Sequence, residues 1–464
     1  MVDLERVYAR LPTALQHLAC STEGLRIQRS RFGRDFERIF AEARVRDRWS
    51  RDQLEAFRGA RLRLFVEHAF RTVPYYRRLG KEIGFDPRSV RDIRDLERLP
   101  VLDKTTVQQR GDEFLSDVVP RKQRLSAHTS GSTGSGLRFA TTLRAVQEQG
   151  ATWWRYEGWH GVTRDLWCGY FGGRSVVPTT QRRPPFWRYN VPGRQILFSG
   201  YHLSDEYLPY YVAELRRRRP PWLHGYPSLL ALLAAHLLSA RSDLGYQLTA
   251  VTTGAENLLP QQIDLIARAF GVRPRQHYGL AEAVANFSEC ERGAMHIDED
   301  FAAVELLPIA DSDSARVIGT NLSNLATPLL RYDSCDVART STEKRCGCGR
   351  AGRLVARVDG RQEDYVVLVN GSRVGRMDHV FKDMITIREA QIVQDRIGTI
   401  TVRVIKGPGY DDASERQLLV ELRKRVGPDT AIAFEHPANL ERTSTGKLRF
   451  VISRLVEGQL TRRG

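Results

Sequence analysis

Residues 248–279 alternate between two hydrophobic patterns within one short stretch of chain. The run LTAVTTG (248–254) has the composition of a strand, QQIDLIARAF (261–270) has helical periodicity, and VRPRQHYG (272–279) is again strand-like. Strands that alternate with helices favour an α/β domain whose sheet is substantially parallel. In such sheets ligands bind beyond the carboxyl ends of the strands. We therefore expect a ligand site at the residues that close these two strands.

The rest of the chain divides into regions with different hydrophobic patterns. Residues 1 to about 110 hold charged, apolar-periodic segments such as RDQLEAFRGARLRLFVEHAFR (51–71), which predict helices. Beyond Gly360 a strand pattern, a helix pattern and a basic end follow. We predict a large N-terminal α/β domain over residues 1–359 and a small α+β C-terminal domain over residues 360–464.

A loop rich in glycine and serine, HTSGSTGSG, occupies residues 128–136. This composition is typical of flexible linkers, but strand-like and helix-like patterns follow it, which indicates a position inside a domain. Gly131 to Gly136 fit the first half of a Walker loop, whereas Leu137 and Arg138 stand where that motif requires Lys and Ser/Thr. Backbone N–H groups next to glycine, together with hydroxyls, suit an anion. This stretch alone leaves both the linker and the phosphate loop open.

Five short motifs follow this loop in a recognisable order. They are Thr253-Gly254-Ala255-Glu256, Tyr278-Gly279-Leu280-Ala281-Glu282, Arg331-Tyr332-Asp333-Ser334-Cys335-Asp336, Gly360-Arg361-Gln362-Glu363-Asp364 and Ser444-Thr445-Gly446-Lys447. Over roughly residues 70–464 their order and spacing resemble the adenylate-forming (acyl-CoA synthetase-like) superfamily, in particular its phenylacetate–CoA ligase-like, capsule-biosynthesis-associated branch. The resemblance implies the fold of that superfamily, with a mobile small C-terminal domain, and an AMP-forming acid ligase.

The resemblance also assigns a nucleotide site to these motifs. The loop residues that would wrap the β- and γ-phosphates of ATP are Thr129, Ser130, Gly131, Ser132, Thr133 and Gly134. The remaining nucleotide contacts would come from Gly254, Ala255 and Glu256 on the adenine side, and from Tyr278, Gly279, Asp336 and Arg361. Asp336 would accept hydrogen bonds from the ribose hydroxyls, because a carboxylate offers only acceptors. Glu282 would help hold Mg²⁺, a hard cation that prefers carboxylate and phosphate oxygens.

Lys447 is the catalytic residue that the resemblance implies, together with Glu282. A lone lysine in an arginine-rich tail is a compact charge that can bridge a carboxylate and the α-phosphate, two anions that repel each other. Glu363 stands at the hinge position, where the family often has Asp, and either residue should let the small domain reorient. Two departures concern the nucleotide site: no lysine follows the phosphate loop, and Cys335 replaces the glycine before the ribose aspartate.

The cysteines give an independent signal. Cys290, His296, Cys346 and Cys348 could complete a tetrahedral zinc site of three sulfurs and one nitrogen, although the spacing of Cys346 and Cys348 is closer than is usual in structural zinc sites. Similar positions bind zinc in some members of the resembling family. Four protein ligands leave no open position for substrate, so we expect a structural role. Cys20, Cys168 and Cys335 are interpreted as small apolar residues.

Charge and hydropathy bear on the remaining partner classes. The net charge is +16, but only 8 of the 71 basic residues are lysines and the arginines are spread along almost the whole chain, which indicates a solvated surface more than a nucleic-acid interface. No run approaches a membrane span, and the first residues lack the pattern of a signal peptide. We expect a cytoplasmic biosynthetic enzyme that has no membrane span and no nucleic-acid partner.

The sequence therefore predicts that a carboxylic acid and ATP give acyl-AMP and pyrophosphate. The acyl group is expected to pass to CoA or another thiol, such as that of a carrier protein. Two alternatives stay open: transfer to an amine, which makes an amide, and a catalytically impaired nucleotide- or acyl-binding protein. The aromatic residues Trp153, Trp154, Tyr156 and Trp159, followed by Tyr170, could form an acyl-pocket wall or could be ordinary core.

Overall fold

The structure is a computed structural model of the 464-residue chain. It describes residues 4–129, 137–173, 175–204, 206–256, 258, 260–310, 313–358, 366–374, 377–381, 386–407, 409–438, 440–441 and 451–455. Several predicted site residues lie outside this set: Ser130, Gly131, Ser132, Thr133, Gly134, Arg361, Glu363 and Lys447. Their roles stay predictions, as does the domain boundary near residue 360.

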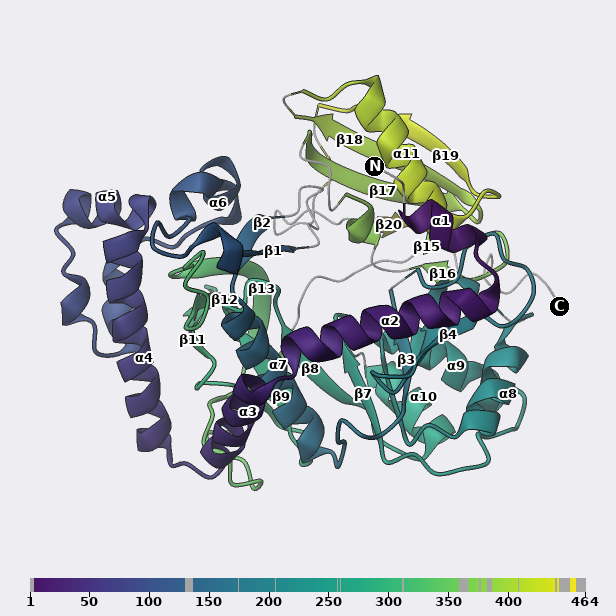
Figure 1. The fold of residues 1–464 in the computed structure, drawn as a ribbon, viewed down its shortest axis with the longest axis horizontal. Helices are drawn as coiled ribbons and strands as arrows, with labels where there is room; N and C mark the ends of the chain where they lie inside the picture. Colours follow the sequence, from purple (N-terminus) through teal and green to yellow (C-terminus); the bar gives the residue numbers. More distant parts are fainter. Residues whose placement is uncertain are drawn as a thin grey trace.

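Helices dominate the first 110 residues, as the periodicity predicts (Figure 1). They are α1 (Leu4–Arg10), α2 (Thr13–Arg31), α3 (Arg34–Arg46), α4 (Arg51–Thr72), α5 (Pro74–Ile83) and α6 (Lys104–Gln109), with 3₁₀ turns η1 (Pro87–Ser89), η2 (Ile93–Arg98), η3 (Gly111–Phe114) and, further on, η4 (Arg121–Gln123). Ser50 begins α4 with a capping box, because its side chain and that of Gln53 satisfy each other's backbone N–H groups. Within the described part of the chain, no helix has the length and apolar character needed to cross a membrane.

The predicted parallel sheet forms the centre of the large domain. Its parallel strands lie in the order β8-β7-β6-β3-β5. These strands and the neighbouring helices are β3 (Cys168–Gly172), β5 (Gln195–Ser199), β6 (Trp222–Gly225), β7 (Ala250–Gly254), β8 (Arg275–Gly279), α7 (Leu143–Trp159), η5 (Gly200–His202), α8 (Leu208–Arg218), α9 (Pro227–Ser239) and α10 (Pro260–Phe270). The strand, helix and strand expected over 248–279 correspond to β7, α10 and β8.

Helices cover both faces of this sheet. Alternate residues of β3 and β6 point to opposite faces, so Phe171 and Leu223 join a core built with α8, α9 and α10. Cys168 and Trp222, which are paired neighbours on those strands, face the other way and pack near Trp153 and Trp154 of α7. In Figure 1 the long helix α2 crosses in front of the sheet, on the same side as α7.

The sheet continues as an antiparallel extension that the sequence patterns did not predict. The complete order is β11-β12-β13-β14-β10-β9-β8-β7-β6-β3-β5-β4. The added strands are β4 (Trp187–Asn190), β9 (Asn286–Glu289), β10 (Met295–Ile297), β11 (Ala302–Pro308), β12 (Ser314–Asn321), β13 (Tyr332–Thr340) and β14 (Leu354–Val358). A separate hairpin pairs β1 (Leu125–His128) with β2 (Arg138–Thr141).

A smaller α/β domain follows, with its own core beneath α11. Its elements are β15 (Val366–Val367), β16 (Arg373–Val374), η6 (Met377–Phe381), β17 (Ile387–Arg396), β18 (Thr399–Lys406), α11 (Asp412–Val426), β19 (Ala431–Glu435) and β20 (Val451–Ser453). Strands β19-β18-β17-β20 form one sheet. Tyr201 of the large domain joins this core and accepts a hydrogen bond from Arg425, 3.2 Å away. The mixed sheet with helices and the smaller C-terminal domain confirm the predicted fold class.

Candidate functional site

The base of the Gly/Ser loop is closed by two hydrogen bonds. The backbone N–H of Thr129 donates to the carbonyl oxygen of Leu137, and the N–H of Leu137 donates to Thr129 Oγ1, each over 2.9 Å. Both residues are buried. The ends of the loop are therefore held together where β1 and β2 begin to pair, which a slack linker does not require. Among the predicted phosphate-loop residues, the structure describes Thr129 alone.

Two predicted motifs meet at one edge of the sheet because their strands are parallel neighbours. Gly254 ends β7 and Gly279 ends β8, and Gly254 is opposite His277 across the pair. Ala255 follows with φ of 68°, a left-handed conformation that an alanine rarely adopts. The side chain of Glu256, which comes next, is half-buried. This edge is where the carboxyl ends of parallel strands place ligands.

Asp336 is carried to the same edge by a bulge in β13. Pairing with β12 is regular on both sides of Ser334–Asp336, but Val317 alone faces these three residues. The bulge places Cys335 at φ of 61°, the left-handed region that favours glycine. Asp336 is 5% exposed, and Tyr278 Oη donates to its Oδ2 over 2.8 Å. The structure thus brings together Tyr278 and Asp336, which are 58 residues apart in sequence.

The interpretation of Cys335 as a small apolar residue is wrong. Its side chain is exposed, and its backbone N–H donates to Asp333 Oδ1 over 2.9 Å. A positive φ favours glycine, the residue that Cys335 replaces in the family resemblance described above. The bulge nevertheless forms with cysteine at this position. Cys168 is buried in the core as expected, and Cys20 is half-buried.

Glu282, from the same motif as Tyr278, is nearly buried, with 8% of its surface exposed. Tyr332 Oη donates to Glu282 Oε1 over 3.3 Å, and Asn321 Nδ2 donates to the Glu282 carbonyl oxygen over 3.2 Å. Tyr332 begins β13, the strand that carries Asp336. Two carboxylates from separate motifs therefore each accept a hydrogen bond from a tyrosine, and both bonds involve a residue of β13: Tyr332, which donates to Glu282, and Asp336, which accepts from Tyr278.

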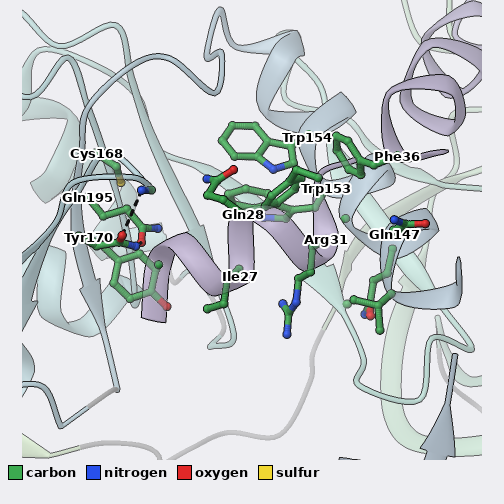
Figure 2. A pocket seen from close by; sticks show the side chains of 18 of the residues that line it. Ile27, Gln28, Arg31, Phe36, Gln147, Trp153, Trp154, Cys168, Tyr170 and Gln195 are labelled. Carbon is green, nitrogen blue, oxygen red and sulfur yellow. Dashed lines mark hydrogen bonds between the residues drawn. The ribbon is translucent and has the colours of Figure 1, made fainter. Parts of the chain in front are cut away.

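A cavity of about 490 Å³ adjoins the nucleotide motifs on the α7 face of the sheet. Ala255, Gly279 and Leu280 line one side of it. The opposite side is formed by residues of β3, β5 and β4, and α2 and α7 complete the wall (Figure 2). This volume is typical of a pocket for a small organic ligand.

The aromatic residues of α7 divide between the two roles that the sequence left open. Trp153, Trp154 and Tyr170 line the cavity, as Figure 2 shows. Tyr156 is fully buried and belongs to the core. Trp159 points to the opposite end of the domain, where its Nε1 donates to Asp47 and Arg350 lies 4.0 Å above its ring.

One wall of the cavity was not predicted from the sequence. Four residues of α2 line it at helical spacing, namely Gly24, Ile27, Gln28 and Arg31. Gln147 of α7, Gln195 of β5 and Asn190 of β4 were missed as well. The signal that could have revealed α2 is the glycine in the middle of a 19-residue helix, because such a residue often marks a close contact.

Beneath the cavity lies a hydrogen-bonded group of neutral side chains. Thr252 Oγ1 donates to Glu157 Oε1 over 3.1 Å and is 2.9 Å from His224 Nδ1. Burial raises the pKa of Glu157 well above its usual value, and desolvation lowers the pKa of His224 to about 4. Desolvation likewise lowers the pKa of His277, which lines the cavity, to about 3. At neutral pH these groups add no net charge to the cavity floor.

The predicted metal ligands form a compact cluster away from the cavity. Cys290 follows β9, His296 is in β10, and Cys346 and Cys348 lie between β13 and β14. Their ligand atoms all lie within 4.8 Å of one another. Cys290 Sγ is 3.7 Å from Cys346 Sγ, and Cys348 Sγ is 3.3 Å from His296 Nε2. Tetrahedral zinc bonds of about 2.0–2.3 Å imply ligand separations of roughly 3.5–3.8 Å, so the donor set and spacing fit zinc.

The environment of this cluster is largely desolvated. Burial raises the pKa of Cys290 to about 12 and lowers that of His296 to about 4. The thiol is therefore protonated at neutral pH unless a cation replaces the proton, whereas the imidazole is already in the neutral form that ligates metals. The cluster lies where the β9–β10 hairpin meets the loop before β14, in the antiparallel half of the sheet.

Comparisons with known proteins agree with this geometry. A family model described as the CapK C-terminal domain matches residues 367–454. Protein CapK of Staphylococcus aureus is 25% identical and covers 97% of this chain and all of its own length. A phenylacetate–coenzyme A ligase of Thermus thermophilus is 26% identical over 87% of this chain and 97% of its own length.

The fold also matches solved structures. A 2-hydroxyisobutyryl-CoA ligase, solved with its acyl-AMP and CoA in the thioesterification state, superposes with a TM-score of 0.55. It is 19% identical and covers 88% of this chain and 91% of its own length. At this identity the match concerns the fold. The chain is thus similar over most of its length to protein CapK and to a phenylacetate–CoA ligase, and it shares its fold with a solved CoA ligase.

Proposed function

We propose that this protein is an AMP-forming acid ligase that activates a carboxylic acid with ATP and transfers the acyl group to CoA. The observation that carries the proposal is one juxtaposition. The carboxylates of Asp336 and Glu282 accept hydrogen bonds from Tyr278, next to the end of β8, and from Tyr332, respectively. Tyr332 shares a core with Leu137, which closes the loop base with Thr129. A ligand-sized cavity opens at the same end of β8. The homologous phenylacetate–CoA ligases support the same reaction class.

The nucleotide would lie along the strand edge. Asp336 would accept hydrogen bonds from the ribose hydroxyls, since Tyr278 already orients one of its oxygens. The adenine would lie against Gly254, Ala255 and Glu256, where the chain turns away from β7. Arg361, which lies outside the described residues, is proposed to contact the nucleotide near the ribose and phosphate.

The phosphates would occupy the loop that Thr129 closes, with Ser130, Gly131, Ser132, Thr133 and Gly134 supplying N–H and hydroxyl donors. Glu282 fits a Mg²⁺ ligand, because it is a nearly buried carboxylate and the hydrogen bond that it accepts from Tyr332 is long, at 3.3 Å. When bound, Mg²⁺ neutralises phosphate charge as pyrophosphate leaves.

The chemistry has two steps. A carboxylate oxygen of the acid attacks the α-phosphorus, and the bond to the oxygen that bridges to the β-phosphate breaks, so that pyrophosphate departs. The thiolate of CoA then attacks the acyl carbon, and the bond to the AMP phosphate oxygen breaks. Lys447 is proposed to offset the repulsion between carboxylate and α-phosphate in the first step. Glu363 is proposed as the hinge about which the small domain reorients between the two steps.

The Cys290, His296, Cys346 and Cys348 cluster is proposed to hold a structural zinc ion. The three thiols and one imidazole match the donor set of structural sites, and their mutual distances leave room for one ion. All four positions around a tetrahedral ion would be taken by the protein. The proposed role is to fix the antiparallel strands that carry Asp336.

Pyrophosphate release tests the proposed function. The purified protein is incubated with ATP and Mg²⁺ across a panel of carboxylic acids, each with no acceptor, with CoA, or with hydroxylamine to capture an acyl-adenylate. We expect release that depends on the acid, hydroxamate formation, and acceleration by CoA. Acid-dependent release that CoA leaves unchanged but an amine accelerates would favour amide formation. Silence across the panel from protein that binds ATP would favour an impaired binder.

Metal analysis tests the zinc proposal separately. We expect about one zinc per chain in protein purified without added metal, and less than a tenth of that in Cys346→Ser. Cys20→Ser, a cysteine outside the cluster, serves as the control and should keep its zinc. Zinc-free protein with unchanged thermal stability would contradict the proposal.

A further inference from the structure

Helix α2 is built into the wall of the cavity by one close contact. A Cβ atom on Gly24 would lie 1.7 Å from Oδ1 of Asn190, so only glycine lets α2 approach β4 this closely. Asn190 cannot easily move, because its Oδ1 accepts from the Gly193 N–H and its Nδ2 donates to Gln195 Oε1. The contact places Ile27 and Gln28, one turn further along α2, over the cavity (Figure 2).

Amide side chains with unused hydrogen-bonding groups face this cavity. Gln147 is 6% exposed and lines it, yet its side chain makes no hydrogen bond within the described part of the chain. Gln28 is half-buried and likewise has no side-chain partner there. Gln195 uses its oxygen to accept from Asn190, which leaves its NH₂ group available. None of these amide atoms is among the buried side-chain atoms that lack a hydrogen-bond partner, so they are open to the cavity, where water can satisfy them. A ligand that displaces this water without replacing its hydrogen bonds is disfavoured by about 1–3 kcal/mol per group.

The cavity extends across several strands of the sheet. Gly279 on β8 and Gln195 on β5 both line it, and these strands are separated by four strand spacings, about 19 Å of sheet width. Between them lie the rings of Trp153 and Tyr170. Indole and phenol rings pack best against another flat ring. A single small aryl acid with its carboxylate near Gly279 would not reach Gln195.

We propose that the acid substrate is an extended, ring-bearing carboxylic acid with hydrogen-bonding substituents away from its carboxylate, selected by the amides of Gln28, Gln147 and Gln195. This inference rests on the proposed function, because acid activation fixes the carboxylate at the nucleotide edge. A site that offers unpaired amides rejects a hydrocarbon of the same shape, since the amides then stay unpaired after water is expelled.

A matched pair of acids tests the proposal. 4′-Acetamidobiphenyl-4-acrylate and 4′-isobutylbiphenyl-4-acrylate have nearly the same extended shape, but only the first carries hydrogen-bonding groups at its far end. Binding to the full-length protein is measured by calorimetry and by quenching of tryptophan fluorescence, and pyrophosphate release is measured in parallel. We expect the acetamido acid to bind at least tenfold more tightly, although the isobutyl acid is more hydrophobic.

The variant Gln28→Leu/Gln147→Leu should reduce this preference at least threefold, because it removes two of the three amides and leaves Gln195 in place. Neither amide has a partner among the described residues, so the change leaves no other polar group there unsatisfied and should not impair folding. The control Gln417→Leu makes the same change on the exposed face of α11 and should keep the wild-type ratio.

Three results would overturn the inference: equal or tighter binding of the isobutyl acid, a preference that is unchanged in the double variant, or no binding of either acid. Pyrophosphate release with some other acid would in those cases leave the proposed function intact. Tight binding of the acetamido acid without pyrophosphate release from any acid would instead count against the proposed function.

Discussion

The nucleotide edge and the acid cavity adjoin each other but are built in opposite ways. At the nucleotide edge the two carboxylates already have protein partners, from Tyr278 to Asp336 and from Tyr332 to Glu282. In the cavity, Gln147 and Gln28 have none among the described residues. A site whose polar groups are fixed in advance suits a constant ligand, because the cost of orienting these groups is met during folding. Open amides suit a ligand that brings its own partners.

The two regions also differ in how many residues have a strained, left-handed backbone. Four left-handed non-glycine residues of the described chain lie in or beside the motifs of the nucleotide edge, namely Ala255, Ala283, Arg331 and Cys335. Of the others, Arg194, in the turn between β4 and β5, lies next to cavity residues, and Arg219 and Arg241 lie elsewhere. Such conformations cost on the order of 1–3 kcal/mol each and persist where the surroundings enforce them. In the cavity wall, α2 and α7 contribute regular helical surfaces. The nucleotide side is thus specified by local backbone geometry, and the acid side by the packing of distant elements.

Lys447→Ala should break the nucleotide side most severely. Removing the cation that offsets carboxylate–phosphate repulsion is expected to slow acyl-adenylate formation by about 10²–10³-fold. The measurement is acid-dependent exchange between labelled pyrophosphate and ATP. Lys81→Ala on the exposed surface of α5 is the control and should leave exchange unchanged. Adenylation at the wild-type rate in Lys447→Ala would refute the role assigned to this lysine.

Asp336→Asn should weaken ATP binding while sparing the acid. Hydrogen bonds to a charged group contribute about 1.5–3 kcal/mol, so we expect the KM for ATP to rise roughly 10- to 100-fold with little change in the KM for the acid. Tyr278→Phe removes only the hydrogen bond that orients the carboxylate and should raise the KM for ATP severalfold. Asp264→Asn, exposed on α10, should do neither. Equal losses in both KM values would contradict a division of labour between edge and cavity.

The same division explains what could be read from the sequence. Gly254 and Gly279 were predictable because each ends a strand whose pattern is local, and parallel pairing then brings them to one edge. The four candidate metal ligands were predictable from their chemistry, and the structure brings them together. Tyr278 and Asp336 were named singly from the family resemblance, but their hydrogen bond depends on the bulge in β13, which no local pattern predicts.

The acid cavity could not be read in this way. Its walls come from α2, α7, β3, β5 and β4, which meet only after the chain has folded. Gln28 and Gln147 are ordinary helix residues in sequence, and nothing local distinguishes them from surface glutamines. The antiparallel extension was missed for a related reason: β9 and β10 are only four and three residues long and bury polar side chains such as Ser288 and His296, so they offer no recognisable hydrophobic run.

Gly24→Ala should disturb the cavity and spare the nucleotide edge. The added methyl group overlaps Asn190, so α2 must move outward or Asn190 must give up its hydrogen bonds. We expect the KM for the acid to rise at least tenfold while the KM for ATP stays within twofold. Gly158→Ala is the matched control, because a Cβ there meets nothing within 4 Å and alanine should slightly stabilise α7. If both KM values changed together, α2 would support the whole domain and not the cavity alone.

Cys335→Gly should produce the smallest effect, a change in the free energy of unfolding that separates backbone strain from the effect of the thiol. Glycine relieves the left-handed strain of about 1–2 kcal/mol, but it also adds flexibility to the unfolded chain, which costs about 0.4–1 kcal/mol. A net gain of about 0.5–1 kcal/mol in the free energy of unfolding should be visible in denaturant titrations. Cys335→Ala removes the thiol yet keeps the positive φ, so it should gain nothing. If alanine stabilises as much as glycine, the effect lies in the exposed thiol and the strain assigned to this edge is absent. Glycine alone could instead stabilise the protein and leave the affinity for ATP unchanged. In that case the hydrogen bonds donated by Ser334 and Tyr278 hold the bulge, and the strain at Cys335 is not needed for binding.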